Sequence, residues 1–180
     1  TRFFENLLGH PNITVKLGVN ALDRLSVSSD SLLLDGVNTT IPVIYTGALD
    51  ELFGHIYGRL PYRSLRFEWK YTERDSVQLA PVVAYPQEKD YTRITEYKKL
   101  PAQNRPGSSY AVEYPLPYQD GTYMEPYYPI LTEASQKQYA QYRELADRIP
   151  SLIPCGRLAD FKYYNMDQAL EAALKKCGMV

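Results

Sequence analysis

Apolar and polar residues alternate through the middle of the chain, with the period of two that is typical of strands buried on one face. The alternating or apolar segments of this kind are 62–69, 82–85, 91–97 and 110–114. They follow one another along the chain, which predicts an antiparallel sheet. Shorter apolar runs, which predict strands resembling pieces of an α/β sheet, are 13–17, 32–34 and 41–45.

Helical patterns lie on either side of this region. The first eight residues are typical of the last turns of a helix that ends at Gly9, and a short helix is expected over 48–56, after the turn Thr46-Gly47. Two more helices are expected near the end of the chain, the second capped by Asn165. Their expected apolar faces are Tyr139, Tyr142, Leu145, Ala146 and Ile149 in one helix, and Leu170, Ala173, Leu174 and Cys177 in the other.

The segment 115–131 carries four prolines and one glycine, so it is expected to be a long loop. The order of the elements predicts an α+β fold, in which mixed-sheet pieces of one domain accompany an antiparallel sheet and C-terminal helices. The expected boundaries place 1–60 and 132–180 in the first domain and 61–131 in the antiparallel-sheet domain.

Charge and hydropathy narrow the class of partner. The chain has 180 residues, 44% of them hydrophobic, and its 20 basic and 21 acidic residues are interspersed, for a formal net charge of −1. Neither a nucleic acid nor a membrane is therefore expected as a partner, and we expect a cytoplasmic protein. Cys155 and Cys177 show no CxxC spacing and no nearby histidine, so neither a metal site nor a disulfide is expected.

Tyrosine is unusually frequent, with 17 tyrosines against 5 phenylalanines and 1 tryptophan. Nine of the tyrosines lie between Tyr85 and Tyr128. Because tyrosine joins an apolar ring to a hydroxyl group, this density suits a surface that packs beside a polar ligand.

Arg93 and the pair Tyr127-Tyr128 are the candidate binding residues of that region. Arg93 is expected to share a strand face with Tyr91 and Thr95, and its planar guanidinium suits a diphosphate. Prolines on both sides of Tyr127-Tyr128 would hold the two hydroxyls at low entropic cost. Plainer interpretations are a surface arginine paired with Glu96 or with a neighbouring strand, and a rigid turn that buries one tyrosine ring.

Five segments, taken in order, resemble the UDP-galactopyranose mutase family. They are Val43-Ile44-Tyr45-Thr46-Gly47, Tyr62-Arg63-Ser64-Leu65-Arg66-Phe67-Glu68, Tyr91-Thr92-Arg93-Ile94, Glu125-Pro126-Tyr127-Tyr128-Pro129, and Gly156-Arg157-Leu158-Ala159 continuing to Lys162-Tyr163-Tyr164-Asn165-Met166. Their order makes the resemblance specific, and it covers nearly the whole chain. Family members begin with a GxGxxG fingerprint that these 180 residues lack, so we expect the C-terminal portion of a mutase.

The resemblance implies a flavoenzyme that interconverts UDP-galactopyranose and UDP-galactofuranose through an adduct of the sugar with N5 of reduced FAD. It implies that Arg93 is catalytic and binds the substrate diphosphate together with Tyr127, Tyr128 and Tyr164. The residues implied to contact FAD are Thr46, Gly47, Gly156, Arg157, Leu158, Asn165 and Met166. Residues outside this chain would hold most of the FAD, so the isolated chain is expected to be inactive.

The same resemblance assigns the expected domains. Residues 1–60 would be what remains of FAD-domain and helical-domain elements, 61–131 the substrate domain, and 132–180 the helices that complete the FAD-binding domain. The parent enzyme would need NAD(P)H or another reductant, and a homodimer is one expected assembly.

Three positions depart from the family pattern. Cys155 stands where a second glycine is usual, Phe161 where a tyrosine is expected, and Asn165 where an aspartate is expected. Phe161 lacks a hydroxyl, so a sugar or phosphate contact there is not carried over. Glu113 matches a family acid, but on an edge strand it is expected to be solvated.

Two other functions stay open at this point. A different FAD-dependent oxidoreductase, of amine-oxidase-like architecture, would share the Gly-Arg step before the final helix but would need no diphosphate clamp. A non-enzymatic sugar-binding module, whose tyrosine-rich face stacks on glycan rings, would need neither flavin nor UDP.

Overall fold

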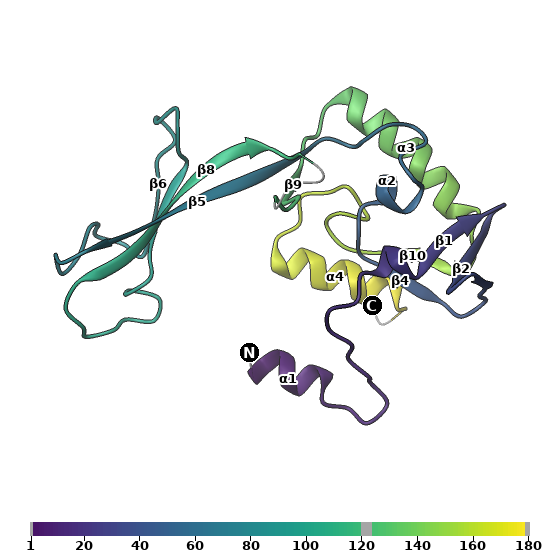
Figure 1. Ribbon diagram of the computed structural model, residues 1–180, viewed down its shortest axis with the longest axis horizontal. Coiled ribbons are helices and arrows are strands. Elements are labelled where there is room, and N and C mark those ends of the chain that lie inside the picture. The colour runs from purple at the N-terminus through teal and green to yellow at the C-terminus, as the bar shows by residue number, and fades with distance from the viewer. Residues whose placement is uncertain (1, 120–123, 179–180) are drawn as a thin grey trace.

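The computed structural model describes residues 2–119 and 124–178, and it confirms the α+β class. A long ribbon of antiparallel strands extends from a body built of helices and short strands (Figure 1). Helix α1 (Arg2–Leu8), drawn in purple, lies apart from that body (Figure 1). The remaining helices are η1 (Ala21–Asp23), α2 (Leu49–Leu52), α3 (Glu133–Asp147) and α4 (Met166–Lys176).

Two small sheets belong to the body. The first is antiparallel in the order β1-β2-β3, with bounds Leu25–Ser28, Ser31–Leu34 and Val37–Asn38. The second pairs β4 (Val43–Tyr45) with β10 (Leu152–Pro154) in parallel. Parallel neighbours need a long crossover, and here the whole antiparallel ribbon and α3 lie between the two strands in sequence.

The core of the body lies between α3 and the segment that follows β4. Tyr142, Ala146 and Ile149 of the predicted apolar face are all buried, which confirms that face. The Tyr142 hydroxyl donates to the carbonyl oxygen of Gly58 at 2.6 Å and accepts from the amide of Tyr57 at 2.9 Å. The buried ring therefore keeps its polar end paired while it ties α3 to the chain after α2.

The predicted antiparallel sheet is confirmed, with strand order β6-β7-β8-β5-β9. The two long strands β5 (Tyr62–Thr72) and β8 (Ser108–Pro117) form its centre. The three short strands are β6 (Val82–Ala84), β7 (Arg93–Glu96) and β9 (Tyr128–Pro129). Tyr62, at the start of β5, is buried against Phe161 of the body, so the sheet begins from the core.

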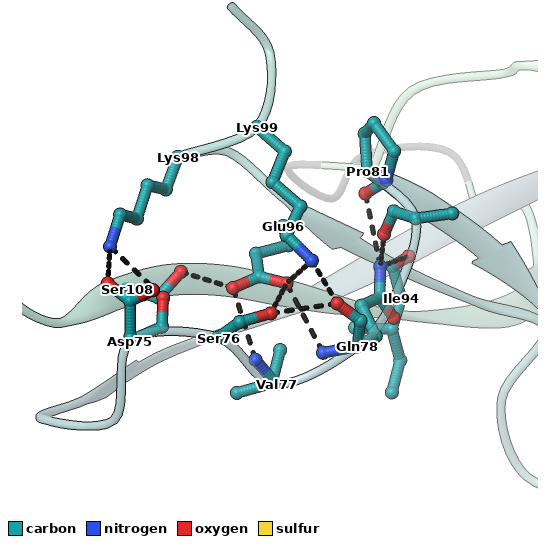
Figure 2. Close-up of polar contacts among 11 residues, drawn as sticks. Asp75, Ser76, Val77, Gln78, Pro81, Ile94, Glu96, Lys98, Lys99 and Ser108 are labelled. Atoms are coloured by element: carbon teal, nitrogen blue, oxygen red, sulfur yellow. Dashed lines mark hydrogen bonds and ion pairs between the residues drawn. The ribbon is translucent and has the colours of Figure 1, made fainter. Parts of the chain in front are cut away.

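A buried carboxylate fixes the connection between β5 and β6. Glu96 is fully buried and accepts hydrogen bonds from the Ser108 hydroxyl at 2.6 Å and from the amides of Val77 and Gln78 at 3.1 and 3.3 Å (Figure 2). The ammonium of Lys99 lies 3.2 Å from the same carboxylate. Burial alone would raise the pKa of Glu96, but these hydrogen bonds outweigh it and lower the pKa to about 2.

Two predicted elements are wrong near the start of the chain. The alternating segment 13–17 is not a strand, because no described strand pairs with it, and the side chains of Ile13, Val15 and Leu17 are exposed. The helix expected over 48–56 is shorter, since Gly54 and His55 adopt positive φ values of 59° and 57° and end it.

Three further expectations are corrected. The run 41–45 is only half-buried, because its strand pairs on one side only and Ile44 is exposed. The expected loop 115–131 contains the end of β8 and all of β9, since Tyr128 pairs with Arg63 across the sheet. No residue of α4 is buried, and Leu170 on its expected core face is 61% exposed, because an apolar stripe does not itself define what packs on it.

Candidate functional site

A hollow of about 590 Å³ lies over the sheet, lined by residues of β5, β9, the start of β7 and Pro115 of β8. Its charged and aromatic lining residues are Arg63, Arg93, Tyr128 and Tyr163. The pairing of β9 with β5 brings Tyr128 opposite Arg63, and the Tyr127 amide donates to the Arg63 carbonyl at 2.9 Å. Arg93 and Tyr128, two of the predicted site residues, therefore lie on one side of the sheet.

Arg93 is held by an acid on the next strand. Its Nε lies 3.2 Å from Oε2 of Glu113, and the Thr95 hydroxyl donates to Oε1 of the same carboxylate at 3.3 Å. Glu113 was expected on an edge strand and solvated, which is wrong: β8 lies between β7 and β5, and Glu113 is buried. The Arg93 side chain is 43% exposed, so it is oriented by Glu113 and still reaches the hollow.

Thr95 shares the face of Arg93, as predicted, but Tyr91 does not. Strand β7 begins only at Arg93, and the Tyr91 ring packs edge-on against Tyr114 at 6.3 Å. Tyr114 alternates with Glu113 along β8 and so lies on the opposite face of the sheet. One plainer interpretation of Arg93 was an ion pair with a residue of a neighbouring strand. The contact between its Nε and Glu113 on β8 is such a pair.

Arg157 links the hollow to the body. Its guanidinium carbon lies 4.9 Å from the centre of the Tyr128 ring and 5.5 Å from that of Tyr163. The two rings stack with centres 5.2 Å apart and planes at 20°. Such cation–aromatic packing holds Tyr128 and Tyr163 in one orientation beside the hollow.

The other two predicted tyrosines do not line this hollow. Tyr127 contributes its carbonyl oxygen, which accepts from Nη1 of Arg157 at 3.2 Å. Tyr164 contributes its carbonyl oxygen to Nη2 of Arg157 at 2.6 Å, while its hydroxyl donates to Asp160 at 3.3 Å. Burial and Asp160 together raise the pKa of the Tyr164 hydroxyl.

Three of the residues predicted to contact a cofactor, Thr46, Gly47 and Gly156, lie at the carboxyl ends of β4 and β10. Tyr45 and Pro154 are paired at the end of the two strands, and Thr46 and Gly156 follow within two residues. Gly156 has φ +105°, and a Cβ built there would meet only the side chain of Thr46, at 3.9 Å. This edge of a parallel pair, with a glycine open to close approach, suits a dinucleotide cofactor.

The remaining predicted cofactor residues differ in setting. Gly47 follows Thr46 at the same edge, and Leu158 packs on the core. Asn165 precedes α4, and its backbone amide donates to the side chain of Gln168 at 2.9 Å, which is the reciprocal half of a capping box. The side chain of Met166 is exposed, so only its backbone belongs to the helix start.

Phe161 and Cys155 are buried beside this edge. The Phe161 ring stacks on Tyr139 at 5.4 Å and meets Tyr62 edge-on at 5.5 Å, so its side chain belongs to the core. Cys155 is a buried free thiol whose pKa is raised by burial, and Cys177 is an exposed one.

Sequence reasoning missed three residues of this site. Arg63 and Tyr163 lie inside motifs that were recognised, yet only the pairing of β5 with β9 and the stacking on Arg157 bring them to the hollow. Asp160 is buried, and its carboxylate accepts hydrogen bonds from the Gly156 amide and the Tyr164 hydroxyl. The cationic groups of Arg143 and Lys176 lie beside the same carboxylate. A single aspartate beside Ala159 carries no sequence signal of this kind.

Neither a metal centre nor a membrane helix stands out in the described parts of the chain. Residues 2–119 and 124–178 contain no cluster of three metal-ligating side chains, and His55 lies 3.4 Å from Asp50. None of the helices within these ranges combines the length and the apolarity that crossing a bilayer requires.

Comparison with known proteins matches this arrangement to one family. The profile described as GLF, UDP-galactopyranose mutase, matches residues 1–163. The chain belongs to the UDP-galactopyranose mutase family. Neither an amine-oxidase-like family nor a family of sugar-binding modules is the one that this profile describes.

Curated relatives agree. The UDP-galactopyranose mutase of Mycoplasma pneumoniae is 37% identical over 180 residues, which are 98% of this chain and 45% of the relative. The dTDP-fucopyranose mutase of Escherichia coli is 32% identical over 177 residues, 97% of this chain and 45% of that protein. A probable UDP-galactopyranose mutase of Klebsiella pneumoniae is 32% identical, over 97% of this chain and 42% of its own length. The chain thus spans less than half the length of these mutase-family relatives.

Proposed function

We propose that this chain supplies the diphosphate-binding wall and part of the FAD-binding edge of an enzyme that interconverts UDP-galactopyranose and UDP-galactofuranose. The observation that carries the proposal is the convergence of Arg63 and Arg93 on one hollow that also presents the Tyr128 and Tyr163 rings. Two guanidinium groups match a ligand with two negative phosphates, which favours planar, paired donors.

Arg93 and Tyr128 have distinct tasks in this diphosphate-binding wall. Arg93 would neutralise the diphosphate as it leaves the sugar and returns, and Glu113 would keep the Arg93 guanidinium oriented while the ligand is absent. Tyr128 is oriented by Arg157 and would donate to a phosphate oxygen. Preorganised groups of this kind stabilise charge without rearrangement at the moment of reaction.

The FAD edge is proposed on the geometry of the two parallel strands. Gly156 lets the cofactor approach the backbone, Thr46 and Gly47 form the opposite strand end, and the start of α4 at Asn165 would favour negative charge through its amide groups. When bound, reduced FAD supplies the nucleophile for the sugar. The side chain of Arg157 reaches from this edge to Tyr128. It would therefore fix the position of the sugar nucleotide relative to the cofactor.

Calorimetric titration of the chain with UDP, UMP and galactose tests the proposal. We expect UDP to bind at least tenfold more tightly than UMP, because the second phosphate meets a second guanidinium, and galactose not to compete. Galactose binding without UDP binding would instead support a sugar-binding module. A further titration with dTDP compares the base preference of this chain with that expected of a dTDP-sugar mutase.

Catalysis needs the rest of a mutase. In a hybrid in which residues 1–180 replace the matched segment of the Mycoplasma pneumoniae relative, we expect conversion of UDP-galactofuranose under reducing conditions. A hybrid that binds FAD and UDP but gives no conversion would contradict the proposed reaction.

A further inference from the structure

The two arginines of the hollow lie at different places along the sheet. Arg63 is the second residue of β5, and Tyr128 of β9 is its partner in the strand register. Arg93 lies opposite Glu113, which in turn lies opposite Phe67 of β5. Arg93 is therefore level with a residue four positions after Arg63, which is about 13 Å further along the ribbon at ~3.3 Å per residue.

Arg63 lies at the end of the ribbon that joins the body and the cofactor edge. Strand β9, which holds the partner of Arg63, lies at this end (Figure 1). Arg157 follows Gly156 of the cofactor edge, and its guanidinium carbon lies 4.9 Å from the centre of the Tyr128 ring. Contacts thus lead from the cofactor edge through Arg157 and Tyr128 to the backbone of Arg63, whereas Arg93 is displaced along the ribbon away from the body.

The two guanidinium groups also differ in what they contact. Nε of Arg93 lies 3.2 Å from the Glu113 carboxylate, so Arg93 would reach a ligand with its terminal nitrogens. Within residues 2–119 and 124–178, the side chain of Arg63 makes no hydrogen bond or ion pair, and it is exposed. Every N–H donor of Arg63 is therefore available to a ligand, including the planar pair that can bind two oxygens of one phosphate.

The order of groups in the ligand then assigns the two arginines. In a nucleoside diphosphate sugar, the sugar is bonded to the phosphate that is farther from the nucleoside. The proposed reaction takes place at a sugar carbon beside the cofactor, so this sugar-linked phosphate has to lie at the cofactor end of the hollow. We propose that Arg63 binds the sugar-linked phosphate and that Arg93 binds the nucleoside-linked phosphate. The inference rests on the proposed function and adds to it the direction in which the ligand lies.

Arg63 is accordingly the residue that makes the hollow prefer a diphosphate to a monophosphate. UMP carries only the nucleoside-linked phosphate, which is the partner of Arg93. UDP adds the second phosphate, which is the partner of Arg63. Loss of Arg63 should therefore remove the advantage of UDP over UMP, whereas loss of Arg93 should weaken the binding of both nucleotides.

Calorimetric titration of the chain with UDP and with UMP measures this difference. We expect the wild type to bind UDP at least about tenfold more tightly than UMP, and Arg63→Gln to bind the two within about threefold of each other. Arg93→Gln should weaken both nucleotides by a similar factor of about ten or more, so that their affinity ratio stays close to that of the wild type. The assignment is overturned if the ratio falls in Arg93→Gln and persists in Arg63→Gln, falls equally in both variants, or changes in neither.

Arg66→Gln is the matched control. It removes the same charge from the same strand, but Arg66 lies on the opposite face of the sheet, with its guanidinium carbon 4.0 Å from the centre of the Tyr114 ring. This variant should bind both nucleotides like the wild type, and a ratio as low as that of Arg63→Gln would show an effect of overall charge instead. Arg63→Lys should recover part of the ratio, because it keeps the charge but lacks the planar fork.

Failure of the proposed function would look different. If the wild type binds neither UDP nor UMP, the diphosphate-binding wall and the assignment of its arginines are both wrong. If UDP binds and Arg93→Gln weakens it, but Arg63→Gln keeps the wild-type ratio, only the assignment of Arg63 to the sugar-linked phosphate fails.

Discussion

Arg93 on β7 and Glu113 on β8 lie directly opposite each other in the sheet, with Nε and Oε2 3.2 Å apart. The pair joins an exposed guanidinium to a buried carboxylate, so the position of Arg93 is set by the centre of the sheet. The side chain that we propose as a phosphate ligand is therefore placed before any ligand arrives.

The UDP affinity of variants at Arg93 should depend on both the charge and the shape of the side chain. Arg93→Ala should weaken UDP binding more than tenfold, because losing a hydrogen bond to a charged group costs about 1.5–3 kcal/mol. Arg93→Lys should recover part of the loss, since it restores the charge but not the planar fork. Calorimetry on the chain measures affinity, and kcat/KM of the hybrid enzyme measures the effect on turnover, with flavin content checked. Equal affinities for the lysine and alanine variants would contradict a paired guanidinium contact.

Glu96 should make stability depend on pH in the acid range. Its folded pKa of about 2 lies below the ordinary value of 4.5, so its contribution is fully present above pH 4.5 and is lost as the pH falls towards 2. The contribution is at most about 3 kcal/mol. Urea unfolding of Glu96→Gln should show lower stability at pH 7 and a smaller loss between pH 4.5 and 2.5.

Glu88→Gln provides the matched control, because Glu88 is an exposed glutamate in the neighbouring turn. It should unfold like the wild type at both pH values. An unchanged acid dependence in Glu96→Gln would show that other carboxyl groups dominate.

Gly156→Ala should damage the cofactor edge through the backbone. The residue has φ +105°, a conformation that an L side chain rarely adopts, so the substitution is strained although space is open. We expect a loss of about 1–3 kcal/mol in unfolding free energy and weaker FAD binding in the hybrid. Gly36→Ala, at φ +78° in a turn between β2 and β3, should cost similar stability and leave FAD binding unchanged.

Phe161→Tyr, a change toward the family residue, should be unfavourable in this chain. The ring is buried between Tyr139 and Tyr62, and an added hydroxyl would enter that core. A buried hydroxyl without a partner costs about 1–3 kcal/mol. Thermal unfolding compared with Tyr163→Phe, which changes an exposed ring, measures the cost; equal melting temperatures for wild type and Phe161→Tyr would indicate that the hydroxyl finds a partner.

Local pattern was enough for the antiparallel sheet and for α3. The strands expected over 62–69 and 110–114 pair with each other in the structure, and Tyr142 and Ile149 of the expected helix face are buried. The same reasoning failed for 13–17 and for the apolar stripe of α4. Those patterns are equally regular, but Ile13, Val15 and Leu17 are exposed and no residue of α4 is buried, so regular spacing does not by itself bury a stripe.

The candidate site also has features that the sequence predicts and features that only packing decides. The sequence by itself determined the residue types: an arginine on a strand, tyrosines between prolines, and a glycine-arginine step before a capped helix. Only the tertiary structure decided which of them meet, because strand pairing places Arg63 and Arg93 beside one hollow and a turn brings Asp160 within hydrogen-bond distance of the Tyr164 hydroxyl. The chemistry of a side chain is set by its residue type alone. Which side chains contact each other depends on strand register and on packing between segments far apart in the chain, and no local pattern encodes these.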